Sequence, residues 1–169
     1  PYSPAKTNCL TSAAAKIIYA IFKTNLIVSG VTFHAGDNAI TYSWGTDFGH
    51  MYPGNKGHNT PDDSAFSTLA LLLRKVADKA KEDSYYTVGK STDVVYPADR
   101  TLEDWAYAEG WEKKTNPEFY PACHPHEILN NVKSLVYLVE TSTNKDPNIP
   151  YLGMKSPDDV CVFKQFPEE

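Results

Sequence analysis

Two nearly uninterrupted apolar and β-branched segments constrain the fold of this chain more than any other feature. The first reads Leu-Ile-Val-Ser-Gly-Val-Thr-Phe over residues 26–33 and is followed by His34. The second reads Ser-Leu-Val-Tyr-Leu-Val over residues 134–139 and is followed by Glu140. Runs of this kind are typical of buried strands. Because each run stops at a polar residue, we expect His34 and Glu140 at the rim of a sheet, where ligands gather in open α/β folds.

Helical and strand-like segments alternate along the rest of the chain. The predicted helices cover residues 11–22, a segment starting at residues 62–64, and residues 101–108, and the further strands cover residues 39–44 and 93–97. Residues 47–60 are rich in Gly, Asn and His, which predicts a long loop. This order predicts an α/β layer architecture.

Composition narrows the class of protein. With 169 residues, 41% of them hydrophobic and 22% charged, the chain has the composition of one folded domain over residues 1–169. A net charge of −5 leaves no excess of Lys and Arg to neutralise phosphates, which argues against non-specific binding to nucleic acid. No apolar run has the length that a bilayer span requires. The absence of an initiator Met and of an apolar leader predicts a mature or excised segment.

Taken one at a time, the candidate site residues allow two interpretations each. His34 suits a metal ligand or general base, or else a hydrogen-bonded histidine at the rim. Glu140 suits an acid–base catalyst, or else a solvated or capping carboxylate. Tyr96 suits a substrate clamp or an ordinary loop aromatic. Asp104, next to Trp105, suits a buried anchored carboxylate or a helix cap. In isolation the ordinary structural role is favoured for every one of them.

Cysteine and serine chemistry are less well supported. The odd cysteine count of three leaves at least one thiol unpaired or paired outside this chain, and the pairing of Cys9, Cys123 and Cys161 stays open, with a Cys9–Cys123 bridge or no bridge at all among the possibilities. Cys123, His124 and His126 form a candidate metal cluster, but Pro125 restricts its geometry and an ordinary loop is favoured. A Ser hydrolase is not supported, because the chain has no Gly-x-Ser-x-Gly elbow.

Five segments taken together change this picture. They read Thr-Phe-His-Ala-Gly over 32–36, Tyr-Ser-Trp-Gly over 42–45, Val-Tyr-Pro over 95–97, Leu-Glu-Asp-Trp-Ala-Tyr over 102–107 and Tyr-Leu-Val-Glu-Thr-Ser over 137–142. In order, spacing and strand context the series resembles the zinc metallocarboxypeptidase family, over about residues 34–140. The resemblance implies an α/β fold with a mixed β-sheet flanked by helices, equivalent to the C-terminal half of the family's catalytic domain.

The resemblance also implies individual roles. His34 is similar to the family's third zinc ligand, and Tyr96 to the flexible Tyr that closes over the C-terminal residue of the substrate. Glu140 is similar to the general base that activates the zinc-bound water. Chemistry of this kind suits hydrolysis of a C-terminal peptide bond, because zinc lowers the pKa of its water and a nearby carboxylate can carry the proton to the leaving amine.

A second group of residues is implied in substrate binding. Asp104 belongs to the Asp-Trp-x-Tyr motif, and Ala35 and Gly36 are the small residues after the zinc-binding His. Glu103 stands where the family has a residue at the floor of the pocket for the terminal side chain. A carboxylate there would favour Lys or Arg by charge pairing. A Glu at a helix start also often points to solvent, and both interpretations stay open.

The chain departs from the family pattern in that Arg100 and Thr101 stand where the family commonly has Gly, and above all in what is absent. The His-x-x-Glu motif that supplies the first two zinc ligands is absent, as are the Arg and Asn residues that bind the substrate carboxylate. The resemblance therefore implies a partial domain, inactive alone, whose partners are a complementary half-domain and the C-termini of peptides or proteins. It also implies a secreted or vesicular, lysosome-like location. The alternative is a non-catalytic, carboxypeptidase-like module within a larger assembly.

Overall fold

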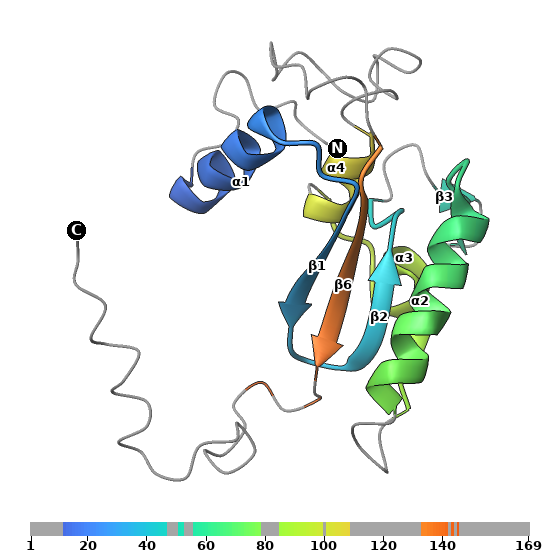
Figure 1. The fold of residues 1–169 in the computed structure, drawn as a ribbon. Coiled ribbons are helices and arrows are strands. Elements are labelled where there is room, and N and C mark those ends of the chain that lie inside the picture. Colours follow the sequence, from blue (N-terminus) through green and yellow to red (C-terminus); the bar gives the residue numbers. More distant parts are fainter. Residues whose placement is uncertain are drawn as a thin grey trace, which may run out of the picture.

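The computed structural model describes residues 12–46, 51–52, 56–78, 85–99, 101–108, 133–141, 143 and 145. In chain order the elements are α1 (Ala13–Thr24), β1 (Ser29–His34), β2 (Asn38–Tyr42), β3 (Met51–Tyr52), β4 (Lys56–Gly57), α2 (Asp63–Ala77), β5 (Thr87–Lys90), α3 (Ser91–Val94), α4 (Leu102–Ala108) and β6 (Leu135–Thr141). Helices pack on a mixed sheet (Figure 1), which confirms the predicted α/β class.

Within the described residues the main sheet has four strands in the order β1-β6-β2-β5. Strand β6 runs parallel to β1 and antiparallel to β2, and β2 runs parallel to β5. The last of the described strands therefore lies between the first two, and the connection from β1 to β2 curves past its C-terminal end (Figure 1). A separate antiparallel pair, β3 and β4, lies beside the main sheet.

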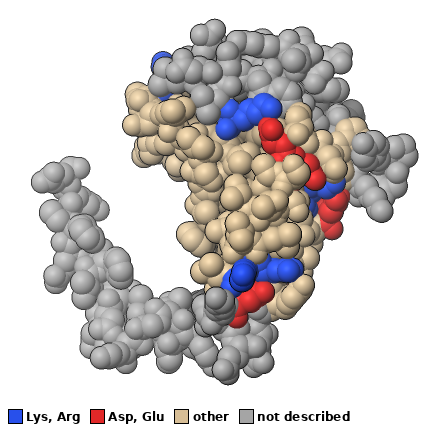
Figure 2. Space-filling model, turned by 45° about the vertical axis from the view of Figure 1, so that its right-hand side comes forward, with Lys and Arg blue, Asp and Glu red and all other residues tan. Residues whose placement is uncertain are grey.

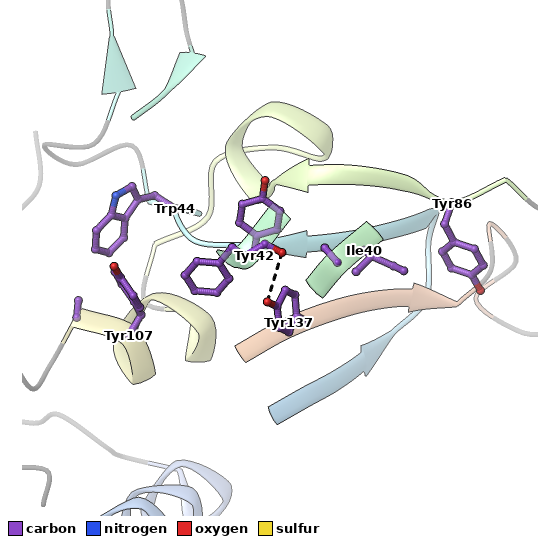
Figure 3. Close-up of a cluster of buried hydrophobic side chains, with 9 residues drawn as sticks. Ile40, Tyr42, Trp44, Tyr86, Tyr107 and Tyr137 are labelled. Atoms are coloured by element: carbon purple, nitrogen blue, oxygen red, sulfur yellow. Dashed lines mark hydrogen bonds between the residues drawn. The ribbon is translucent and has the colours of Figure 1, made fainter. Parts of the chain in front are cut away.

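Helix α2 covers one face of the sheet through a buried aromatic cluster, of which Tyr42, Tyr107 and Tyr137 are labelled in Figure 3. Phe66 of α2 is fully buried and stacks on Tyr42 with ring centroids 5.2 Å apart. The Phe66 ring also meets Tyr107 and Tyr137 edge-on at 5.2 and 5.6 Å. Burial raises the pKa of Tyr137 to about 12, and its hydroxyl donates to the Phe66 carbonyl at 3.3 Å. Four aromatic rings from α2, β2, α4 and β6 thus lock these elements together.

Helices α1 and α4 pack on the opposite face. Ser12 caps α1 by accepting a hydrogen bond from the Ala15 N–H at 3.1 Å. Phe22 of α1 packs with Ala106 of α4 and Val136 of β6 in a second buried cluster. The backbone N–H of Ser134 donates to the Ala106 carbonyl at 3.2 Å, so the C-terminal end of α4 lies next to the start of β6 in space.

Two local predictions are wrong. The segment 93–97 is not a strand: α3 covers Ser91–Val94, and the neighbouring strand is β5, Thr87–Lys90. The segment 47–60 contains the β3–β4 pair instead of being all loop. Long-range contacts explain the difference, because Asp93 accepts from the Gly57 N–H at 2.7 Å and Lys90 donates to the Gly57 carbonyl at 2.8 Å.

A third correction concerns β1, which sequence predicts as fully buried. Among the described strands it lies at the edge of the sheet, and the side chains of Val31 and Phe33 are 41% and 72% exposed. The strand order decides this exposure, because α2 covers β2 and β6 on that face. The predicted loop at 112–125 and the three cysteines lie outside the described residues.

The surface shows no segregation of charge on the face in Figure 2, where basic and acidic side chains lie next to one another. Three of the ion pairs are Lys133–Asp62, Lys90–Asp93 and Arg74–Asp78, at 2.8, 3.2 and 3.9 Å. Lys133 and Tyr107 both donate to the Asp62 carboxylate and lower its pKa. None of the helices within the described ranges combines the length and apolarity that a membrane span requires.

We predict that Phe66→Ala lowers the free energy of unfolding by about 3–5 kcal/mol, because it removes the ring at the centre of the aromatic cluster. The matched control is Leu72→Ala on the same helix, whose side chain is 54% exposed. It should change stability by less than about 1 kcal/mol. Urea denaturation followed by circular dichroism measures both values, and equal losses would contradict the assigned core.

Candidate functional site

The structure brings together His34 and Glu140, although 105 residues separate them along the chain. They are partners in the parallel register of β1 and β6, at the carboxyl ends of both strands. The His34 Nδ1 and Glu140 Oε1 atoms lie 4.0 Å apart. The hydroxyl of Thr141 donates to the His34 carbonyl at 3.0 Å and holds this end of the two strands together. An imidazole and a carboxylate therefore face the same small volume at the rim of the sheet.

The two side chains differ in environment. The His34 side chain is 58% exposed, whereas that of Glu140 is 12% exposed. The Oε2 atom of Glu140 is buried and has no hydrogen-bond partner among the residues that the structure describes. Leaving such an oxygen unpaired costs about 1–3 kcal/mol, so buried carboxylates are ordinarily hydrogen-bonded. The interpretation of Glu140 as a freely solvated strand-end carboxylate is therefore wrong.

The connection between β1 and β2 borders this pair. It consists of Ala35, Gly36 and Asp37, and it passes the end of β6 because β1 and β2 lie on opposite sides of that strand. Gly36 has a φ of +145°, in the region that favours glycine. A Cβ atom at Gly36 would lie 2.8 Å from Cε of the flexible Lys145 side chain, which would have to shift, and the positive φ disfavours any other residue at this position.

Glu103 lies on the same face of the sheet, in the first turn of α4. It is only 3% exposed, and Oε1 accepts a hydrogen bond from the Thr32 hydroxyl at 2.8 Å. Thr32 precedes His34 by two residues on β1, so both side chains are on one face of the strand. The interpretation of Glu103 as a solvent-facing residue is wrong, and its carboxylate points toward the strand that carries His34.

Asp104 anchors the segment that follows β2. Its carboxylate accepts hydrogen bonds from the Gly45 N–H at 2.9 Å and from the Thr46 N–H at 2.8 Å. The capping interpretation of Asp104 is wrong, because the Thr101 hydroxyl accepts from the Asp104 N–H at 3.3 Å and provides the cap of α4. Asp104 is a buried structural carboxylate that ties α4 to the end of β2.

Tyr96 lies between α3 and α4 with a side chain that is 65% exposed. The segment that carries it is attached to the end of β2 through the Ala98 N–H, which donates to the Gly45 carbonyl at 2.7 Å. An exposed ring on a tethered segment has the freedom of movement that a substrate clamp needs. The closing role of Tyr96 stays a prediction.

The donor set fits a zinc centre only in part. Imidazole and carboxylate are zinc ligands, and a catalytic site needs about three of them. Within the described ranges, no group of three or more His, Cys, Asp or Glu residues comes together that could hold a metal ion. His34 and Glu140 therefore do not make a zinc site by themselves, and the cluster at Cys123–His126 lies outside the described residues.

The comparison with protein families decides the affiliation of the chain. The sequence profile of the zinc carboxypeptidases matches residues 3–136, well over half of the chain. The chain belongs to the zinc carboxypeptidase family. Searches of curated proteins and of solved structures found no match. The family match ends four residues before Glu140, so the register with His34 on β1 is the observation that places Glu140 in the site.

Three participants were not identified from the sequence of this member of the zinc carboxypeptidase family. Thr32 binds Glu103 across the sheet, Lys145 lies over Gly36, and the backbone N–H of Thr46 binds Asp104. No motif marks them, because each depends on a contact between segments that are distant in sequence. The φ requirement of Gly36 was the one available signal, since a glycine directly after a strand end predicts a tight turn or a close approach.

We predict that Asp104→Asn lowers the free energy of unfolding by about 2 kcal/mol, because a neutral amide forms weaker hydrogen bonds to the Gly45 and Thr46 N–H groups than the carboxylate and replaces one acceptor oxygen by an NH2 donor. Hydrogen exchange at these two amides should accelerate. The exposed Asp37→Asn provides the control with the same change of charge, and protection of the Gly45 and Thr46 amides should not change in it. Unaltered exchange in Asp104→Asn would contradict the anchoring role.

Proposed function

We propose that this chain is part of a zinc-dependent metallocarboxypeptidase that removes the C-terminal residue of peptides or proteins. The observation that carries the proposal is the His34–Glu140 pair, with the buried and unpartnered Oε2 atom of Glu140. A carboxylate in that state is positioned to accept a proton from a bound water, as a general base does. Membership of the zinc carboxypeptidase family supports the choice of reaction.

In this proposal Glu140 takes a proton from the water that attacks the scissile carbonyl and delivers it to the leaving amine. His34 contributes one metal ligand. Zinc, when bound, would polarise the carbonyl and lower the pKa of the water. The remaining ligands come from outside the described residues, and a complementary half-domain is the partner that the proposal requires. Tyr96 closes over the terminal residue, and Ala35 and Gly36 line the substrate. We also propose a secreted or vesicular location, which rests on the family alone.

Glu103 supports a preference for substrates that end in Lys or Arg. Its carboxylate is buried, and the Thr32 hydroxyl is a weak partner for a charge that has lost its water. A cationic side chain that reaches Glu103 from the His34–Glu140 side would neutralise this charge. The gain would be larger than at an exposed carboxylate, because the local dielectric is low.

A second candidate function is a non-catalytic carboxypeptidase-like module, and the incomplete metal-ligand set within the described residues favours it. Metal analysis of the native full-length protein separates the two functions. One zinc per protein supports the peptidase, and metal-free protein that binds peptides without cleaving them supports the module.

We predict that Glu140→Gln lowers kcat of the full-length protein by about 10²- to 10⁴-fold, because glutamine cannot accept the proton. The assay is release of a C-terminal amino acid from a blocked peptide, with a chelator as a second way of abolishing it. Asp37→Asn removes a carboxylate from the neighbouring connection and should leave the rate unchanged. A wild-type rate in Glu140→Gln would exclude its assignment as the base.

We predict that Glu103→Gln lowers kcat/KM for substrates ending in Lys by about tenfold relative to substrates ending in Leu, because it removes the charge pairing. The ratio of the two kcat/KM values is the measurement, since it cancels losses of total activity. Asp37→Asn should keep the wild-type ratio. An unchanged ratio in Glu103→Gln would show that Glu103 does not determine the preference for the terminal side chain of the substrate.

A further inference from the structure

Three pairs of residues follow one another along the end of β1. The Thr32 hydroxyl donates a hydrogen bond to Oε1 of Glu103 at 2.8 Å, and Nδ1 of His34 lies 4.0 Å from Oε1 of Glu140. Two residues further on, Gly36 lies beneath the side chain of Lys145. The His34–Glu140 pair therefore has a buried acidic group on one side and a basic group on the other.

The position of Lys145 is defined by its contact with Gly36. A Cβ atom built on Gly36 would lie 2.8 Å from Cε and 3.4 Å from Nζ of Lys145, and 3.8 Å from Oε2 of Glu140. The ammonium group of Lys145 and the Oε2 atom of Glu140 therefore both lie within 4 Å of the position that a Cβ atom of residue 36 would occupy. No ion pair within 4.0 Å joins the two groups, and Lys145 is exposed to solvent. The ammonium group is therefore near the site and accessible to an anion.

The direction of a bound peptide follows from this order. If the terminal side chain enters toward Glu103 and the scissile bond lies at Glu140, the preceding residue extends toward Gly36 and Lys145. An extended peptide advances about 3.3 Å per residue, so the side chain before the scissile bond falls within reach of a lysine at this position. The terminal side chain of the substrate then lies near the negative charge of Glu103, and the side chain before the scissile bond lies near the positive charge of Lys145.

We propose that Lys145 is a specificity-determining residue that favours substrates with Asp or Glu immediately before the scissile bond. The inference rests on the proposed peptidase function and deepens it. Glu140 gives the rim a negative charge that repels such side chains, and the ammonium group of Lys145 offsets it on the Gly36 side. Together with Glu103, Lys145 directs the site toward peptides that end in an acidic residue followed by a basic residue.

The test uses the full-length protein and blocked tripeptides that end in X-Lys, where X is Glu, Gln or Lys. Wild-type kcat/KM should be about two- to fivefold higher for X = Glu than for X = Gln, which is the range for a partly exposed ion pair. Lys145→Gln should remove the difference and Lys145→Glu should reverse the order, with X = Lys preferred. The preference should weaken in high salt.

Lys75→Gln on α2 is the control with the same change of charge, and it should keep the wild-type preference. The same three peptides, fluorescently labelled, are also titrated by anisotropy against the Glu140→Gln protein with and without Lys145→Glu. Hydrolysis without any dependence on X overturns the assignment of Lys145 and leaves the peptidase function standing. Binding that prefers X = Glu and reverses in Lys145→Glu, without hydrolysis in the wild type, supports Lys145 and overturns the peptidase. Equal binding of all three peptides overturns the assignment of Lys145.

Discussion

The parallel pairing of β1 with β6 is the interaction on which the rest of the structure depends. It brings a strand from the far end of the described chain between β1 and β2, and it sets His34 opposite Glu140. The same insertion gives each face of the sheet its core, since Tyr137 joins the α2 cluster and Val136 joins the cluster under α1 and α4. A slip of one residue in this register would exchange the two faces of β6 and separate the two site residues.

Much of this arrangement is readable from local sequence. Helical spacing predicts α1, α2 and α4, and the two apolar runs that end in a polar residue predict both strands and the rim position of His34. What local patterns do not contain is strand order. The exposure of Phe33 and the partnership of Thr32 with Glu103 follow from which strand lies next to which, and the short α3 is held by contacts of Asp93 with the distant Gly57. These features are decided by contacts between remote segments.

Two neighbouring residues of α4 have different roles at the site. Glu103 accepts a hydrogen bond from Thr32 of β1, and Asp104 accepts one from the backbone of Gly45 after β2. Because consecutive residues of a helix point in different directions, a single turn of α4 can contact the chain after β2 with one side chain and the proposed substrate site with the next. The metal ligands are the incomplete part, since no group of three or more His, Cys, Asp or Glu residues comes together within the described ranges.

The edge position of β1 has a consequence for handling the protein. Within the described residues β1 pairs on one side only, with β6, and Val31 and Phe33 are left uncovered beside its open side. An unpaired edge with apolar side chains is a template for strand addition, and it promotes aggregation when nothing caps it. We therefore expect the solubility of this chain to depend on whether another segment or a partner pairs with the open edge of β1. Without such pairing the exposed apolar edge would promote aggregation even while the His34–Glu140 site stays intact.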